Sequence, residues 1–594
     1  MVSFRFATRS GEPACWKIDE RSAFPSLRSG PGSRGGPMGP PLHEPWDRIG
    51  GLRCFLFLPG VLFLLAGFCF AQGDRSGRAI PVDSRIAGII VSRIDGHPLA
   101  RARVSLQSTK DRQNVQSVIT EDDGKFAFSG LAPGKYALEG AKRGYIEAGY
   151  DQHEGYSTAI VTGAGLDTEH LILKLAPDGV IAGRVLDESG EPIRQAQVSL
   201  YVDTHQEGIE QISGYRSVQT NDLGMYEMAQ LRPGTYFLAV SAKPWYAMHL
   251  RAQGESSGAA SDGGAERSLD VAYPFTYYAD VTDADSATPI LIRGGEHVQA
   301  DVHLTPVPAL TLVFRVPENG NHGFIPPRLE QRAFDAPVPL QSDGYQMVKP
   351  GEVEISGVPA GKYDMRLQGS ILSGIDIERD GQVIDSSKAD ASSTVKVSVH
   401  PAEGTSLPRQ FVVALRAGSR SFAGARMVDE NGNMELPGIS AGSYELVTFG
   451  AGNQYSIEHM AVDGAEVTGH TITIPAGTAV SVEMSVVAGT GSVEGVAKRA
   501  GKGFAGAMVV LVPEHAEGSR DLFRRDQSDL DGSFALRNVI PGKYTVVAIE
   551  NGWDIDWSRP EVIAVYAKNG RKVEVRPRAG GAVHVPDAVE VVSR

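Results

Sequence analysis

Two tryptophans near the C-terminus are the residues in this sequence that most resemble a binding site. The segment that follows an apolar, strand-like run at 544–549 contains, in order, Trp553, Asp554, Asp556 and Trp557. An indole offers a flat apolar face and a carboxylate offers hydrogen-bond acceptors, a combination that suits a sugar ring. The alternative is that both indoles cap the core of their own module or pack against the next one.

Aromatic residues also follow strand-like runs at two earlier places. Trp245 and Tyr246 occupy the corresponding position in one segment, and Tyr145 and Tyr150 occupy it in another. Loops that follow equivalent strands cluster at one end of a sandwich, where binding loops commonly lie. We therefore include Trp245 and Tyr246 in the predicted glycan-binding set.

Three patterns suggest catalysis or metal binding, and each lacks its required context. His400 and Glu403 have the spacing of zinc carboxypeptidase ligands, but no third ligand or α/β scaffold accompanies them. Gly254–Gly258 fits the nucleophile elbow of hydrolases, but it lies in a Gly/Ser-rich stretch. Asp529–Gly532 contains carboxylates, yet no Glu follows at the EF-hand position, so a hairpin turn is the better interpretation. We predict no catalytic residue, no metal and no cofactor.

A short sequence that recurs five times and ends in Pro/Ala-Gly-x-Tyr marks the strands that position these residues. We predict that its Gly accepts a positive φ in a type II turn and that its Tyr begins a strand, with the ring in the core and the hydroxyl bonded to nearby backbone. The Gly and Tyr pairs are Gly134 and Tyr136, Gly234 and Tyr236, Gly361 and Tyr363, Gly442 and Tyr444, and Gly542 and Tyr544.

Each phrase is preceded by an Asp/Asn-Gly type reversal that predicts a tight hairpin. Three of the units also open with a strand, a Gly-containing turn and a second strand, most clearly in 180–200. Apolar residues alternate along these runs, as half-buried strands require. The fold class expected is all-β, a tandem array of about five β-sandwich modules.

These residues resemble a known family, the carboxypeptidase regulatory-like domain, which has a transthyretin-like β-sandwich with an Ig-like architecture. The resemblance is strong for 84–176, 178–306 and 489–577 and weak between them, and it extends to multi-repeat secreted bacterial proteins. It implies a carbohydrate-binding-like sandwich fold and no reaction, because the module is an accessory to peptidases and transporters.

The domain boundaries expected follow from these repeats. The predicted sandwiches are 84–176, 178–306 with an inserted loop at 251–268, 307–400, 401–488 and 489–577, followed by a tail at 578–594. The third and fourth are degenerate, because they keep the closing phrase and lack the opening one.

The N-terminus is predicted to be a targeting segment. Basic residues precede an apolar run that closes on Ala71, as in a signal peptide at 51–71. Residues 1–50 are then a disordered or wrongly assigned extension, with Met38 as one alternative start. If the segment is not cleaved, it is the protein's contact with the membrane.

Charge and cysteine content exclude some classes of partner and some kinds of site. The formal net charge of −14 argues against nucleic acid. The cysteines, Cys15, Cys54 and Cys69, all precede the modules, so no disulfide or Cys-ligated metal is expected there.

These features together predict a non-catalytic exported protein, periplasmic, surface-exposed or secreted, that forms a rod of structural modules. Its partner is an envelope protein or a polysaccharide. Two alternatives stay open: a carbohydrate-binding protein, and an accessory part of a zinc carboxypeptidase or a transport system.

Overall fold

The computed structural model describes residues 84–594 except for internal segments, so the predicted extension, the signal peptide and the 251–268 loop fall outside the described residues. The internal segments left out are 164, 206–207, 249–268, 316–326, 335, 342–344, 350, 368–369, 386–389, 404, 418–420, 452–453, 518–519 and 577–580.

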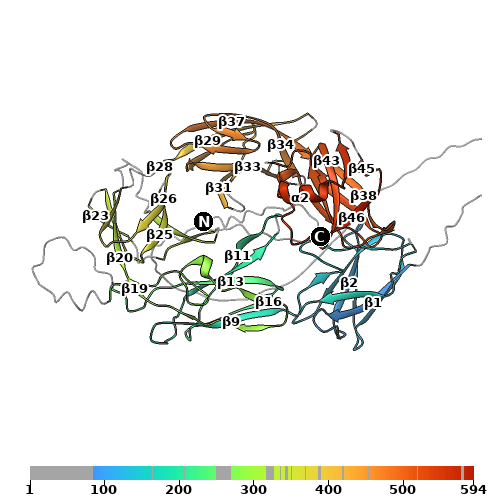
Figure 1. Ribbon diagram of the computed structural model, residues 1–594, viewed down its shortest axis with the longest axis horizontal. Coiled ribbons are helices and arrows are strands. Elements are labelled where there is room, and N and C mark those ends of the chain that lie inside the picture. Colours follow the sequence, from blue (N-terminus) through green and yellow to red (C-terminus); the bar gives the residue numbers. More distant parts are fainter. Residues whose placement is uncertain are drawn as a thin grey trace, which may run out of the picture. The chain divides into compact units, whose positions relative to one another are not determined.

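Strands make up most of the described residues and form five modules, each built from two layers of sheet (Figure 1). The strands of the first module are β1 (Ser84–Ser92), β2 (Arg103–Ser108), β3 (Val115–Ile119), β4 (Lys125–Leu131), β5 (Lys135–Ala141), β6 (Ala148–Gly149), β7 (Ile160–Val161) and β8 (Leu171–Leu175). One layer has the order β4-β1-β8, and the other is centred on β2 and β5.

The second module repeats this arrangement with layers centred on β9 and on β10 with β13. Its elements are β9 (Gly179–Leu186), β10 (Gln197–Thr204), β11 (Gln211–Gln219), β12 (Met225–Leu231), β13 (Gly234–Ser241), β14 (Val271–Ala272), β15 (Thr276–Tyr277), η1 (Ala284–Ser286), β16 (Ile290–Ile292), β17 (His297–Gln299) and β18 (Val302–His303).

The third and fourth modules have the same two-layer form. The third contains β19 (Val307–Pro308), β20 (Leu310–Arg315), β21 (Arg328–Ala333), β22 (Ala336–Pro339), β23 (Tyr345–Lys349), β24 (Glu352–Val358), β25 (Gly361–Leu367), β26 (Ser370–Ile377), β27 (Gln382–Asp385) and β28 (Asp390–Ala391). The fourth contains β29 (Ser393–Pro401), β30 (Phe411–Ala417), β31 (Ser421–Met427), β32 (Asn433–Ile439), β33 (Gly442–Gly450), β34 (Gln454–Asp463), β35 (Glu466–Thr468), β36 (Thr471–Ile474) and β37 (Ala479–Gly489).

The fifth module joins its layers into one nine-stranded sheet, because β46 pairs with both β38 and β43. Its elements are β38 (Gly491–Arg499), β39 (Lys502–Gly503), β40 (Met508–Pro513), η3 (Arg520–Leu522), β41 (Arg524–Gln527), β42 (Ser533–Val539), β43 (Gly542–Glu550), α2 (Pro560–Ala567), β44 (Arg571–Val575), β45 (Ala582–His584) and β46 (Val589–Ser593).

One strand topology is common to all five modules. The first long strand of each pairs antiparallel with the strand before the repeated phrase and parallel with a late strand, as β1 does with β4 and β8. The same pairings link β20 to β24 and β27 in the third module, and β29 to β32 and β37 in the fourth. The two modules that lack the opening phrase in sequence therefore keep the same fold.

A β-bulge precedes the repeated tyrosine in every module. In the first, two residues of β4 lie opposite one of β1, and an equivalent register shift occurs in each of the others. A bulge of this kind needs a residue that tolerates positive φ. That residue is Gly130, Gln230, Gly357, Gly438 or Asn538, with φ between 54° and 78°.

The prediction of a type II turn with positive φ at the Gly two residues before each repeated tyrosine is wrong. Gly134, Gly234 and Gly542 do not have positive φ, and the equivalents in the third and fourth modules have nearly extended values of 158° and 155°. The left-handed residue lies four positions earlier, in the bulge. A Cβ on Gly542 would lie 3.3 Å from the ring of Tyr544, so this Gly makes room for the folded-back ring.

All five repeated tyrosines make the same hydrogen bond. Each hydroxyl donates to the backbone carbonyl four residues earlier, at 2.8–2.9 Å. The rings of Tyr236, Tyr363, Tyr444 and Tyr544 are buried in the cores of their modules, and that of Tyr136 is half-buried. The bond satisfies a phenol that would otherwise be buried without a partner.

Two predicted boundaries are corrected by the strand pairings. The boundary between the third and fourth modules lies between β28 and β29, not between 400 and 401, because β29 pairs with β32 and β37 of the fourth module. The residues predicted as a tail at 578–594 supply β45 and β46, which pair with β38 and β43. Each module has its own buried apolar core.

Candidate functional site

The tryptophans predicted to bind a sugar are buried. Trp553 and Trp557, in the loop between β43 and α2, are 9% and 8% exposed. They complete a second apolar cluster of the fifth module with Met508, Val510, Val512, Phe523, Val547, Ile549, Ile555 and Ile563. Alternate residues of β40 face this cluster and the main core, so β40 is buried on both faces.

The two indoles surround a guanidinium of the same module. The Cζ of Arg525, in β41, lies 5.4 Å from the centroid of the Trp553 ring and 4.8 Å from that of Trp557. Tyr156 of the first module adds a third ring at 5.0 Å. A cation over an aromatic face is attracted by the ring quadrupole, most strongly when water is excluded. The side chain of Arg525 is 5% exposed, so these rings bind a cation of their own chain.

The first module closes this cage with the hairpin between β6 and β7. The backbones of His153 and Tyr156 bond to each other in both directions at 2.9 Å, which presents both rings on one side. The His153 ring stacks on Trp553 with centroids 5.0 Å apart and planes 3° from parallel. Glu154 at the hairpin tip accepts from Arg525 Nη2 at 2.5 Å.

The second module contributes a loop that covers Trp557. The carbonyl of Gly208 accepts from the backbone N and the hydroxyl of Ser558, at 3.1 and 3.0 Å. The backbone N of Glu210 donates to Asp556 at 2.7 Å. Gly208 approaches so closely that a Cβ there would lie 2.6 Å from the Trp557 ring.

The carboxylates between the tryptophans are also engaged within the chain. Asp556 accepts from the Nε of Arg559 at 3.0 Å in addition to Glu210. Asp554 is bound by the guanidinium of Arg594. The indoles and carboxylates of this segment therefore pack against their own and neighbouring modules, which was the alternative interpretation of the sequence. The glycan-binding assignment of these four residues stays a prediction.

A polar strip extends the contact between the first and fifth modules. Lys135 Nζ lies 2.5 Å from Asp529 Oδ2, and the backbone N of Ala159 donates to Asp529 Oδ1 at 3.0 Å. The backbone N of Leu530 donates to the Ala159 carbonyl at 3.0 Å. Burial raises the pKa of Asp529 although Lys135 opposes the shift.

Asp529 belongs to one of the Asp/Asn-Gly reversals, and the structure shows a tight turn there. Gly532 has φ 82°, and its N bonds to the Asp529 carbonyl at 2.8 Å. In the equivalent turn of the fourth module, the Asp429 side chain accepts from its own loop, at the backbone N of Asn431 and Asn433. Asp529 instead bonds to the first module.

Trp245 and Tyr246 lie in a different environment. The Trp245 side chain is 84% exposed, and its ring meets that of Tyr246 edge to face with centroids 5.8 Å apart. The hydroxyls of Tyr246 and Tyr273 both donate to the Glu188 carboxylate. Partial burial and this carboxylate raise the pKa of Tyr246 to about 12.

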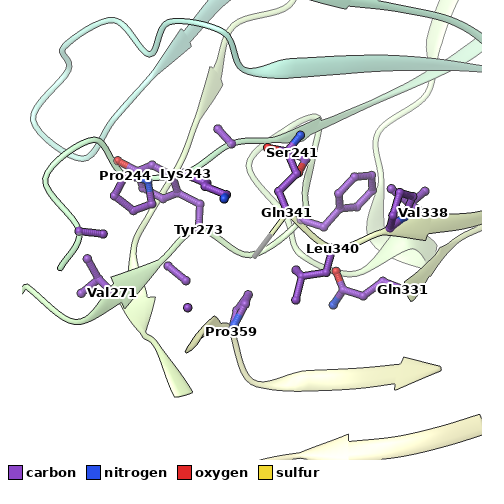
Figure 2. A pocket seen from close by; sticks show the side chains of 16 residues that line it. Ser241, Lys243, Pro244, Val271, Tyr273, Gln331, Val338, Leu340, Gln341 and Pro359 are labelled. Atoms are coloured by element: carbon purple, nitrogen blue, oxygen red, sulfur yellow. The ribbon is translucent and has the colours of Figure 1, made fainter. Parts of the chain in front are cut away.

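A small cavity lies beside this loop. Residues of the second module, among them Ser241 and Tyr273, and residues of the third, among them Leu340 and Pro359, line it (Figure 2). Its free volume is about 20 Å³, which suffices for a single water. The cavity is thus far smaller than the roughly 300 Å³ or more of an ordinary small-molecule site.

The geometry of the described residues does not support the zinc-like or the hydrolase-like pattern. His400 is an exposed residue of β29 whose register partner is Ser485. Gly254–Gly258 lies outside the described residues. The described part of the chain contains no group of three His, Cys, Asp or Glu side chains placed to hold a metal. It also has no helix with the length and apolar character needed to cross a membrane.

Comparison with protein families agrees with the strand topology. The model of the carboxypeptidase regulatory-like domain matches residues 85–161 and 180–251. The first two modules are therefore similar to the carboxypeptidase regulatory-like domain. Residues 489–574 match the second β-sandwich domain of the NOMO1-like subunit of the BOS complex. These regulatory-like domains and the fifth module are the parts for which the sequence resemblance was strongest.

Solved structures with similar arrangements are distant. The Bacillus anthracis TIE protein is 11% identical with a TM-score of 0.15, over 87% of this chain and 68% of that one. The minor pilin GBS52 of Streptococcus agalactiae is 13% identical with a TM-score of 0.20, over 38% of this chain and 96% of that one. At these scores the similarity supports no functional argument. A search of curated proteins found no match.

Sequence reasoning missed the residues that join the modules. Arg525, Gln527 and the hairpin 153–156 bear no recognisable motif, and Lys135 is the variable residue of a repeated phrase. In sequence all of them look like ordinary solvated positions. The contact between the first and fifth modules was likewise not anticipated from the sequence. One available signal was the pair of indoles itself, because a Trp beside a strand often packs.

Proposed function

We propose that this chain is an exported, non-catalytic protein of the cell envelope whose β-sandwich modules serve as structural and interaction units. The regulatory-like domains and the all-β architecture support a structural role. The observation that carries the proposal is that the segment richest in binding chemistry, Trp553–Trp557, packs against the first and second modules of its own chain. Its side chains then stabilise an arrangement of modules.

Two measurements test the proposal: the cellular location of the protein and its metal content. The full-length chain with a C-terminal tag, expressed in a Gram-negative host, is expected in the periplasm, on the surface or in the medium, with the N-terminal segment removed. Metal analysis of the purified protein is expected to find no stoichiometric zinc. Retention in the cytoplasm would contradict the exported role, and one zinc per chain would contradict the non-catalytic one.

Carbohydrate binding is the second candidate, and Trp245 is the observation that favours it. This indole is 84% exposed, beside Tyr246 and the Glu188 carboxylate. Retention on a panel of insoluble polysaccharides such as cellulose, chitin and peptidoglycan would support it if Trp245→Ala abolished retention. Failure to bind any member of the panel, or binding unaffected by that variant, would reject it.

A further inference from the structure

We propose that the first and fifth modules form an interface that holds the two ends of the chain together when the connection between the third and fourth modules is cut. The fifth module's partner is the first module of the same chain, recognised by the hairpin between β6 and β7 and by Lys135. This inference goes beyond the proposed function, because it names a binding surface and its occupant.

Reciprocal apolar contacts are the first support. Leu530, from the turn of the fifth module, packs against the core of the first module. Tyr156, from the hairpin of the first, packs against the second apolar cluster of the fifth. Each module thus completes an apolar surface of the other, which is typical of a specific interface and not of a chance contact.

A buried amide is the second support. Gln527, in β41, is 1% exposed. Its Nε2 donates to the Asp151 carbonyl at 2.6 Å and to the Thr158 hydroxyl at 2.8 Å, and its Oε1 lies 3.2 Å from His153 Nδ1. All of these partners belong to the first module. A buried amide without partners is costly, so this position of the fifth module is matched to the hairpin.

Paired charges are the third support. The Arg525 and Glu154 side chains are 5% and 24% exposed, and those of Lys135 and Asp529 are 36% and 14% exposed. In both pairs the more buried member belongs to the fifth module and the more accessible one to the first. Hydrogen-bonded ion pairs with a desolvated member give an interface its specificity.

The experiment cuts the chain between the two modules. A protease recognition sequence is inserted after Ser392, between β28 of the third module and β29 of the fourth, and the purified full chain is cut. The nicked protein is expected to elute from a sizing column as one particle at micromolar concentration. Separation of the two fragments would overturn the proposal.

Charge reversal on the first module then tests which surface holds the fragments. Lys135→Glu with Glu154→Arg alters only partly exposed side chains, and it is expected to weaken fragment association by roughly 100-fold, about 2.7 kcal/mol. The matched control, Lys125→Glu with Glu147→Arg, makes the same charge changes at side chains that are 74% and 61% exposed. We expect the control to associate like the unaltered chain.

Two further outcomes are decisive. Equal association of the interface variant and the control would overturn the proposal, because contacts other than those between the first and fifth modules, such as those of Gly208 and Glu210 with the fifth module, would then hold the fragments. Light scattering of the uncut chain measures its oligomeric state. If the unaltered chain is a dimer and the interface variant is a monomer, the contact forms between two copies, and the assignment of the partner to the same chain is overturned.

Discussion

The loops after β13 and β43 occupy the same place in the second and fifth modules and have opposite environments. Trp245 is 84% exposed, whereas Trp553 and Trp557 are 9% and 8% exposed. The fifth-module loop is covered by the first-module hairpin and by Gly208 of the second module. Position within a sandwich therefore does not determine whether an aromatic loop is available to a ligand; the neighbouring modules do.

Truncating the tryptophans gives the largest expected contrast. Trp553→Ala removes a buried ring and should lower the local free energy of unfolding of the fifth module by about 3 to 5 kcal/mol. Trp245→Ala removes an exposed ring and should change that of the second by no more than about 0.5 kcal/mol. Hydrogen exchange of the β43 and β13 amides measures both. Similar effects in the two modules would remove the distinction.

The caged cation provides a sharper comparison. Arg525→Met keeps most of the packing but leaves Glu154 without its partner, and should cost about 3 kcal/mol in the fifth module. Arg216 of the second module also lies over a ring, 5.8 Å from the centroid of Tyr215, but is solvent-exposed. Arg216→Met should cost less than about 1 kcal/mol. Calorimetric unfolding of the two variants makes the comparison, and a larger loss for Arg216→Met would refute it.

Acidity should affect the covered region through Asp526. Burial raises the pKa of this carboxyl from 3.8 to about 6. The folded protein then keeps a proton that the unfolded chain has released, so the contribution to stability is full below pH 3.8 and is lost as the pH rises to about 6. The loss amounts to about 3 kcal/mol. Asp526→Asn should abolish this part of the pH dependence of β41 exchange, and an unchanged profile would contradict the assignment.

The smallest expected effect on stability comes from a substitution at Gly208, in the second-module loop that covers Trp557. Gly208 and Gly190 both have positive φ, 74° and 82°, but only a Cβ at Gly208 meets the Trp557 ring, while nothing lies within 4 Å at Gly190. Both alanine variants bear a backbone cost of about 1 kcal/mol. Gly208→Ala should cost about 1 kcal/mol more through the clash and should increase exchange around Trp557. Equal losses would show that this loop does not cover the indole.

Local sequence patterns were enough to predict the modular fold. They could not predict the contacts between modules that are far apart in the sequence. The repeated tyrosine phrase and the alternating strands predict five sandwiches, and all five tyrosines hydrogen-bond to the backbone four residues earlier. The bulge was missed because Gln230 and Asn538 replace Gly at the left-handed position in two modules. The start of β29 was missed because the fourth module lacks the opening phrase.

Only part of the candidate site could be predicted from the sequence. Trp553 and Trp557 stood out by type and spacing, but their ligand, Arg525, sits in a charged stretch that resembles a solvated face. Its other partners, Glu154 and Tyr156, are several hundred positions away. No local pattern reports which modules meet, because that depends on the angles of four successive junctions.

Residue-resolved hydroxyl-radical footprinting of the purified full chain tests the central claim most directly, since it compares the three tryptophans in one sample. If neighbouring modules cover the fifth-module loop, Trp245 is oxidised at least ten times faster than Trp553 and Trp557, and Lys135→Glu with Glu154→Arg narrows the difference. Equal oxidation of all three indoles in the unaltered chain would contradict the account.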